Sequence, residues 1–179
     1  VGDGNHSLAS AKKAYASHPN DISPYALVEI VNIHDPALKF EPIYRVVFGM
    51  ETQKLLDLIQ KEAGGEYYGE DAHLFTCVSE NGKTVLSLKP TSKLPVGTLQ
   101  KALDKIISAT DIRIDYIHGE KELCRLCSAA DTTGFLFRGM EKSELFRGVE
   151  SDGSLPRKTF SMGHADDKRF YLEARRIQK

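Results

Sequence analysis

The chain has 179 residues, of which 41% are hydrophobic and 27% are charged, and its formal net charge at pH 7 is −1. These values are ordinary for a soluble globular protein with one domain or two small ones. They argue against a general nucleic-acid binder, which should be basic, and no apolar run approaches the length of a membrane span. The three cysteines, a low and odd number, favour a reducing compartment, so we predict a cytoplasmic protein.

The first dozen residues predict a tight turn that leads into a helix. Two glycines flank an acid at residues 2–4, a polar triplet follows at residues 5–7, and apolar side chains recur at helical spacing over residues 8–15. The N–H groups at the start of such a helix favour an anion such as phosphate. The structural alternative is a plain helix cap, with Asn5 or Ser7 as the N-cap residue.

The rest of the chain mixes strands and helices. We predict strands over residues 25–33, 44–48, 72–78, 83–88, 112–118, 132–137 and 168–174, and helices over residues 51–62, 96–109, 120–129 and 140–147. Residues 25–33 are almost continuously apolar and β-branched, which is typical of a central strand. Asn81-Gly82 is a strong hairpin signal. We therefore expect an α+β fold with a mixed, largely antiparallel sheet and packed helices.

Two features concern the extent of the domain. The chain starts at Val1, and a turn so close to the start has no preceding strand to position it, so we expect a part of a longer protein. Residues 90–95 form a linker bounded by prolines. The sequence agrees equally well with a domain boundary at this linker and with a single domain over residues 1–179.

Cys124 and Cys127 have the spacing of a redox or metal-binding pair. A zinc site needs about two more ligands, and the sequence has no second cysteine pair. Apolar residues around the two cysteines share one helical face. We therefore interpret them as part of a half-buried helix and predict no metal site.

Three clusters of polar residues are candidates for chemistry. The first is the opening turn, the second joins residues 34–35 to Glu41 and Arg45, and the third is the run 157–161. Guanidinium, ammonium and hydroxyl donors beside one another suit phosphate oxygens. The structural alternatives are a capped helix, a capped strand end and a solvated turn. The chain has neither the lysine and spacing of a P-loop nor a G-x-G-x-x-G motif.

Several segments together resemble a family of proteins of unknown function, domain-of-unknown-function family 1015. The segments that carry the resemblance are residues 2–9, 31–35, 40–45, 155–163 and 169–173, which together extend along nearly the whole chain. Members of the family are longer, which implies that this chain is a carboxy-terminal portion. The resemblance implies no established activity.

The opening motif is also similar to the Asp-Gly-x-His-Arg signature of the ParB/sulfiredoxin-like superfamily. In that superfamily the turn and helix start bind nucleotide phosphates, and its members include chromosome-partition proteins, sulfiredoxin and free-serine kinases. Ser7 stands where the signature has its arginine. The resemblance therefore implies that Arg45, Arg157 or Lys158 supplies the missing charge.

We predict that the protein binds a phosphate-bearing small molecule, a nucleotide or a phosphorylated metabolite, and the reaction that such a site favours is phosphoryl transfer. The predicted phosphate-binding residues are Gly4, Asn5, Ser7, Arg45, Arg157, Lys158 and Thr159, while Asp3, His6 and Glu41 would handle protons or Mg²⁺. One alternative is a ligand-binding or regulatory module without turnover. Another is a ParB-like role in DNA partition, against which the neutral charge argues.

The two ends of the chain are expected to serve one site. The opening turn and residues 156–161 should lie close together, with side chains within about 10 Å, roughly a Debye length in salt. A helix N-terminus opposite two adjacent cations would make one strong anion site from weaker pieces. No nucleic-acid or membrane partner is predicted, and the oligomeric state is left open.

Overall fold

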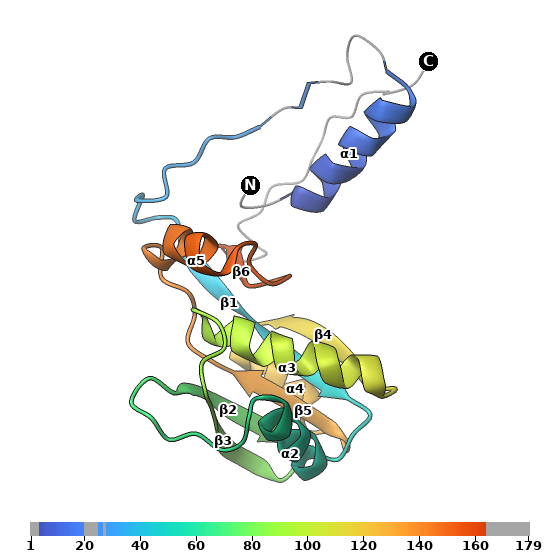
Figure 1. The fold of residues 1–179 in the computed structure, drawn as a ribbon, viewed down its shortest axis with the longest axis vertical. Coiled ribbons are helices and arrows are strands. Elements are labelled where there is room, and N and C mark those ends of the chain that lie inside the picture. Colours follow the sequence, from blue (N-terminus) through green and yellow to red (C-terminus); the bar gives the residue numbers. More distant parts are fainter. Residues whose placement is uncertain (1–3, 20–24, 27, 164–179) are drawn as a thin grey trace. The chain divides into compact units, whose positions relative to one another are not determined.

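The computed structural model describes residues 4–19, 25–26 and 28–163, apart from the side chain of His6. The chain divides into two compact units, one made of Val1–Leu38 and Met162–Lys179 and the other of Lys39–Ser161. Residues 90–95, where the sequence suggested a boundary, lie inside the second unit. The first unit contains the helix α1 (Asn5–Ser17), and nearly all other regular structure lies in the second unit (Figure 1).

The second unit is built on a single sheet. Its elements in chain order are β1 (Phe40–Phe48), α2 (Thr52–Glu62), β2 (His73–Ser79), β3 (Gly82–Leu88), α3 (Pro95–Ala109), β4 (Arg113–His118), α4 (Glu120–Leu126), β5 (Thr132–Leu136), α5 (Glu144–Asp152) and β6 (Phe160–Met162), whose last residue belongs to the first unit. The strand order is β3-β2-β5-β1-β4, and β6 also pairs with β1. β1 is antiparallel to β4 and β5, as β2 is to β3 and β5, so the predicted α+β fold is confirmed.

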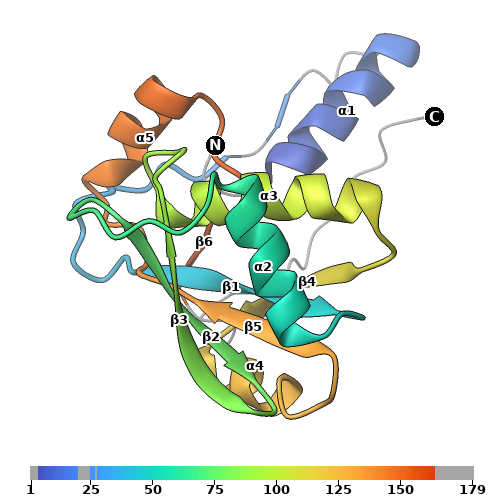
Figure 2. The same ribbon diagram turned by 60° about the horizontal axis from the view of Figure 1, so that its bottom comes forward.

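Helices cover both faces of the sheet (Figure 2). α2 and α3 pack on one face around a large apolar core that includes Leu55 and Leu99, whereas α4 packs on the other face around a smaller core with Leu123. Successive residues of a strand point to opposite faces. In β1, accordingly, Val47 belongs to the larger core and Val46 to the smaller one. Both are fully buried, so β1 is covered on both of its faces.

Local signals place the hairpin and the two long helices of this unit close to where they were predicted. The hairpin is formed by β2 and β3, with Ser79 paired to Gly82 and a turn at residues 80–81 between them. The carboxylate of Glu51 caps α2 by accepting hydrogen bonds from the N–H groups of its first turn. Gly64 and Gly65 follow α2 with φ values of 92° and 100°, as a helix C-terminus often requires.

The predicted strand over residues 25–33 was wrong. None of the described residues in that range is in a strand. Most of their apolar side chains are exposed, with Tyr25 and Val28 each 71% exposed and Ile30 95% exposed, whereas Ile33 is half-buried. A strand requires a neighbouring strand to pair its N–H and C=O groups. The apolar composition indicated the tendency to form a strand but could not supply that neighbour.

Other predicted elements differ from the observed ones in their limits. β1 begins at Phe40, four positions earlier than predicted, α4 ends earlier, and α5 lies a turn later than the predicted helix 140–147. Pro42 is tolerated in β1 because the ladder to β4 begins at Ile43. The short strand β6 was not predicted, and the predicted strand 168–174 lies outside the described residues.

The two neighbouring cysteines belong to the α4 segment, as predicted. Cys124 is half-buried within α4, and Cys127 is buried where the helix ends. Burial raises the pKa of Cys127 to about 11 and that of Cys77 to about 12, which disfavours the reactive thiolates. Among the described residues, no helix is long and apolar enough to cross a membrane.

Candidate functional site

The opening helix starts on a glycine. Gly4 precedes α1 with φ 89° and ψ 11°, a left-handed conformation that a residue with a side chain rarely adopts, and it is the N-cap residue in place of Asn5 or Ser7. As a glycine, Gly4 supplies no side-chain cap to the helix. The side chains of Asn5 and Ser7 in the first turn are exposed. The positive end of the helix dipole therefore lies at Gly4 and the first turn of α1.

The three predicted catalytic residues are Asp3, His6 and Glu41. Asp3 and the side chain of His6 lie outside the described part of the structure. Glu41 is half-buried in β1, one residue after Phe40. The ring of Phe40 stacks on that of Phe160 with centroids 4.3 Å apart, which brings this end of β1 beside the segment that carries the third polar cluster.

Arg45 is the most unusual of the predicted site residues because it is fully buried. Its Nε donates to Oε1 of Gln100 at 2.8 Å, and Nη1 donates to the backbone oxygen of Ile43 at 2.6 Å. Nη1 also donates to the backbone oxygen of Lys158, and Nη2 to that of Arg157, each at 2.8 Å. The guanidinium thus joins β1, α3 and the turn at 157–158 through charge-assisted hydrogen bonds.

The surroundings of Arg45 keep its charge in spite of burial. Burial lowers the pKa of Arg45 to about 10, and Tyr116 and Asp104 act in the opposite direction. The ring of Tyr116 lies under the guanidinium, with the Arg45 carbon Cζ 4.6 Å from the ring centroid. Gln100, which accepts from Arg45, donates in turn to Asp104 at 2.7 Å. At neutral pH the guanidinium therefore remains protonated, with its donors directed at protein acceptors.

The turn bound by Arg45 has an ordered backbone and exposed cationic side chains. Lys158 adopts φ 53°, which is uncommon for a residue with a side chain. The hydroxyl of Thr159 donates to the backbone oxygen of Pro156 at 2.7 Å and closes the turn, and Thr159 itself is buried. The side chains of Arg157 and Lys158 are exposed. Because Arg45 holds their carbonyl groups inward, the two side chains are presented outward together.

The structure therefore brings together Arg45, Arg157, Lys158 and Thr159, with Glu41 on the same strand as Arg45. The residues of the opening turn belong to the other compact unit. Sequence reasoning missed Gln100 and Tyr116 as partners of Arg45. The signal for Gln100 was available, since it lies four positions after Val96 and three before Leu103, on the apolar face of α3.

Ser161 is a further buried polar residue of this region. It is only 6% exposed, and its hydroxyl oxygen has no hydrogen-bond partner in the described part of the chain. A buried hydroxyl without a partner is uncommon in native proteins. It lies two residues beyond Thr159, on the strand that pairs with β1.

The comparisons with solved structures show likeness of fold. A conserved hypothetical protein from Pyrococcus furiosus is 18% identical, with a TM-score of 0.62 over 91% of this chain and 69% of that chain. A mutant free serine kinase in complex with AMP is 19% identical, with a TM-score of 0.63, and one in complex with ADP is 17% identical, with a TM-score of 0.59. Each of these two matches covers 91% of this chain and 66% of the kinase.

The chain thus spans about two thirds of the length of these solved proteins. No curated protein matches the sequence. The model of one family, described as "Protein of unknown function (DUF1015)", matches residues 1–106, which is more than half of the chain. The chain therefore belongs to the DUF1015 family.

Proposed function

We propose that this protein binds the phosphate groups of a nucleotide and takes part in phosphoryl transfer. The observation that carries the proposal is the turn at 157–158, where two exposed cationic side chains project from a backbone that the buried Arg45 holds in place. Preordered cations bind phosphate with less loss of side-chain and loop entropy than mobile ones. A fork of guanidinium donors and a nearby ammonium group suit phosphate oxygens.

The likeness of fold supports a nucleotide as the ligand. Free serine kinases of this fold have been solved with AMP and with ADP. At 17–19% identity this likeness concerns the fold alone, so the ligand is carried to this chain as part of the proposal. A nucleotide also agrees with the predicted role of the opening turn, because a helix N-terminus favours a phosphate group.

In this proposal the predicted residues have distinct roles. Arg157 and Lys158 neutralise the phosphate charge of the ligand. Arg45 is a positioning residue, because its N–H groups are directed at Gln100 and at three backbone oxygens. The acidic residues Asp3 and Glu41 are the oxygen donors that Mg²⁺ prefers.

The catalytic part of the proposal assigns proton transfer to the remaining polar residues. Phosphoryl transfer to a hydroxyl group requires that the hydroxyl proton be removed as the new bond to phosphorus forms. Asp3, His6 or Glu41 would accept this proton. A regulatory module that binds the same nucleotide without turnover is the alternative, and a DNA-partition role gains no support from a chain with a net charge of −1.

A thermal-shift measurement with AMP, ADP, ATP and inorganic phosphate tests the binding step. A ligand present at 100 times its Kd should stabilise the folded protein by about 2.7 kcal/mol. The variant carrying Arg157→Gln and Lys158→Gln should lose most of this effect. The control carrying Lys121→Gln and Arg147→Gln removes the same charges from other exposed positions and should keep it. No shift with any ligand, or equal loss in both variants, would contradict the proposed site.

Turnover separates the enzyme from the regulatory module. With Mg²⁺, ADP or ATP as donor and L-serine as a first hydroxyl acceptor, ³¹P NMR should show a new phosphate monoester and an equal loss of donor. Glu41→Gln should reduce the rate by about a hundredfold or more if Glu41 is the base, with nucleotide binding retained. Binding without any phosphoryl transfer across a panel of hydroxyl acceptors would favour the regulatory alternative.

A further inference from the structure

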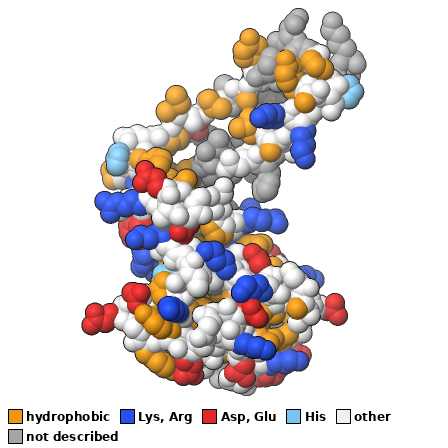
Figure 3. Space-filling model, in the orientation of Figure 1, with side chains coloured by type: hydrophobic (Ala, Val, Ile, Leu, Met, Phe, Trp, Pro, Cys, Tyr) orange, Lys and Arg blue, Asp and Glu red, His pale blue; other side chains and the backbone are white. Residues whose placement is uncertain are grey.

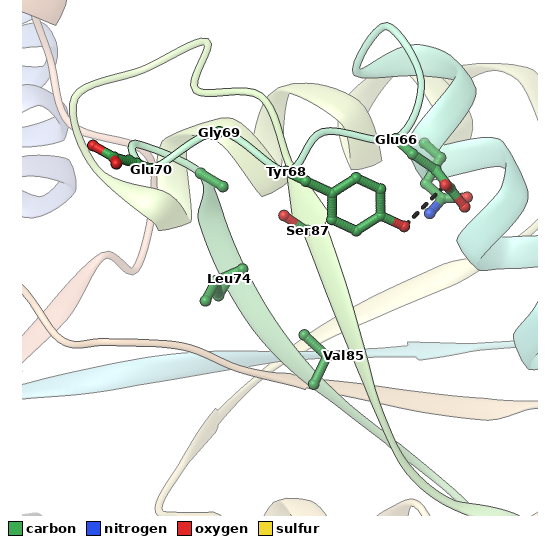
Figure 4. Close-up of a pocket in the computed structure, with 9 residues that line it drawn as sticks. Glu66, Tyr68, Gly69, Glu70, Leu74, Val85 and Ser87 are labelled. Atoms are coloured by element: carbon green, nitrogen blue, oxygen red, sulfur yellow. Dashed lines mark hydrogen bonds between the residues drawn. The ribbon is translucent and has the colours of Figure 1, made fainter.

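A pocket of about 450 Å³ opens beside the β2–β3 hairpin, and none of the residues assigned above to the phosphate lines it. Glu66, Tyr68 and Glu70 from the loop after α2 form one side, and Leu74, Val85 and Ser87 from the two strands form the other (Figure 4). The volume falls within the range of pockets that bind small molecules.

The floor of the pocket is apolar and open to solvent. Leu74 is paired with Ser87 in the hairpin and lies diagonally opposite Val85 on the same face. Leu74 is 59% exposed, Val85 is 71% exposed and Tyr68 is 80% exposed. α4 packs on the same face of the hairpin but at its other end, against Val78, and therefore does not cover these three side chains. A gathering of exposed apolar side chains of this kind marks a binding surface more often than isolated ones do.

The loop that forms the other side is held by several internal contacts. The Tyr67 hydroxyl donates to Asp71 at 2.7 Å, and the hydroxyl of Ser87 donates to the backbone oxygen of Tyr67. The N–H of Ala72 donates to the backbone oxygen of Gly69 at 3.0 Å. The end of the Tyr67 side chain lies close over Gly69, where an added Cβ would be 2.5 Å from the Cζ atom of Tyr67. These contacts within the protein hold this side of the pocket in place.

The charged residues that line this pocket are both acidic. Figure 4 shows the carboxylates of Glu66 and Glu70 on opposite sides of the Tyr68 ring, and the described residues that line the pocket include no Lys or Arg. The hydroxyl of Tyr68 donates to Glu66 at 2.9 Å, which fixes the ring beside one carboxylate. The pocket thus combines an aliphatic floor, the face of an aromatic ring and two negative charges. A hard metal ion would use the carboxylates but not the apolar floor.

We propose that this pocket binds an aliphatic ammonium group. The alkyl stem would lie over Leu74 and Val85, and the ammonium group would meet Glu70 or Glu66 with Tyr68 beside it. Either one end of a diamine or a lysine side chain would supply this ammonium group. The site is independent of the phosphate-binding function proposed above, because the two share no residues.

Titration of the ¹⁵N-labelled protein with 1,5-diaminopentane tests this site by NMR. Saturable chemical-shift changes should be confined to residues 66–74 and 85–87. Pentane-1,5-diol has the same alkyl stem without charge and should bind at least about tenfold more weakly. The variant Glu70→Gln should bind 1,5-diaminopentane more weakly by a similar factor. A third titration with Nα-acetyl-lysine amide distinguishes the source, because tighter binding of this probe would assign the pocket to a lysine side chain of a protein.

Two further variants separate a true site from general attraction to acidic surface. Glu80→Gln removes an exposed carboxylate at the tip of the same hairpin, outside the pocket, and should leave the affinity unchanged. Val85→Ser changes the floor without changing charge and should weaken binding about fivefold. Shifts spread over the acidic residues of the whole surface, an equal effect of Glu80→Gln, or no saturable binding of either amine would each overturn the proposal.

Discussion

The guanidinium of Arg45 donates to the backbone oxygen of Lys158 at 2.8 Å, across 113 positions of the sequence. This bond joins β1, an inner strand of the sheet, to the turn that carries two exposed cations. The hydrogen bond matters for stability because it is buried. Neither the charged guanidinium nor the carbonyl groups that accept from it can bond to water instead. The space-filling view shows Lys and Arg side chains over much of the surface, whereas Arg45 is 0% exposed (Figure 3).

Replacing Arg45 should therefore affect stability more than replacing an exposed arginine. We expect Arg45→Met to lower the free energy of unfolding by about 3 kcal/mol, because it leaves buried carbonyl groups without donors. Arg113→Met is the control, since Arg113 is an exposed residue over the ring of Phe48, and it should cost less than about 1 kcal/mol. Urea unfolding measures both. Equal losses of unfolding free energy in the two variants would show that the buried hydrogen bonds of Arg45 do not add to stability.

Backbone conformation at Lys158 allows charge and strain to be tested separately. Lys158→Gly should raise stability by about 1 kcal/mol because φ 53° is disfavoured for a residue with a side chain, yet it should weaken nucleotide binding by removing a cation. Lys158→Ala should weaken binding equally without the gain in stability. Asp131 has the same φ, so Asp131→Gly should stabilise the protein and leave binding unchanged. If Lys158→Gly binds nucleotide as the unmodified protein does, Lys158 is not a phosphate ligand.

Close packing of α4 on the sheet depends on a glycine in β5. A Cβ added at Gly134 would lie 2.5 Å from Cδ2 of Leu123 and 2.6 Å from Sγ of Cys127. We expect Gly134→Ala to lower the free energy of unfolding by about 2–3 kcal/mol through overpacking. Adding Leu123→Ala should relieve part of this loss, so that the double variant is more stable than the sum of the single changes predicts. Additive effects in thermal or urea unfolding would contradict this packing.

His73 should make the stability of the protein depend on pH. Its Nδ1 lies 2.9 Å from the hydroxyl oxygen of Thr98, which also accepts from the N–H of Thr91. Burial, followed by the charge of Arg138, lowers the pKa of His73 in the folded state below the value of an exposed histidine. The unfolded chain therefore takes up a proton at a higher pH than the folded one, and stability falls as pH decreases through and below about 6.5.

The measurement for His73 compares unfolding free energies at about pH 7.5 and about pH 5. The fall between the two should be smaller in His73→Gln than in the unmodified protein, because the variant cannot take up this proton. His34→Gln, which changes a histidine in an exposed turn, is the control. A fall of the same size in all three proteins would exclude His73 as a contributor.

Short-range signals in the sequence determined much of the second unit. The hairpin between β2 and β3 follows from a polar, glycine-containing turn between two alternating segments, and α2 follows from one apolar face, the cap at Glu51 and the glycines after its end. These features depend on backbone geometry and side-chain spacing within a few residues, so they can be read before the fold is known. The dibasic run at 157–158 could be identified in the same way.

Only the tertiary structure determined which other segments these segments contact. Residues 25–33 have the composition of a strand, but a strand also needs a paired neighbour, which its own residues do not specify. Arg45 was predicted to contact phosphate, yet its donors are directed at Gln100 and at backbone groups more than a hundred positions away, because burying a guanidinium requires acceptors on every side. The pocket between Tyr68 and Val85 arises likewise from the register of β3 against β2 and the path of a loop. Contacts between distant segments depend on how the whole chain packs, and local spacing does not encode them.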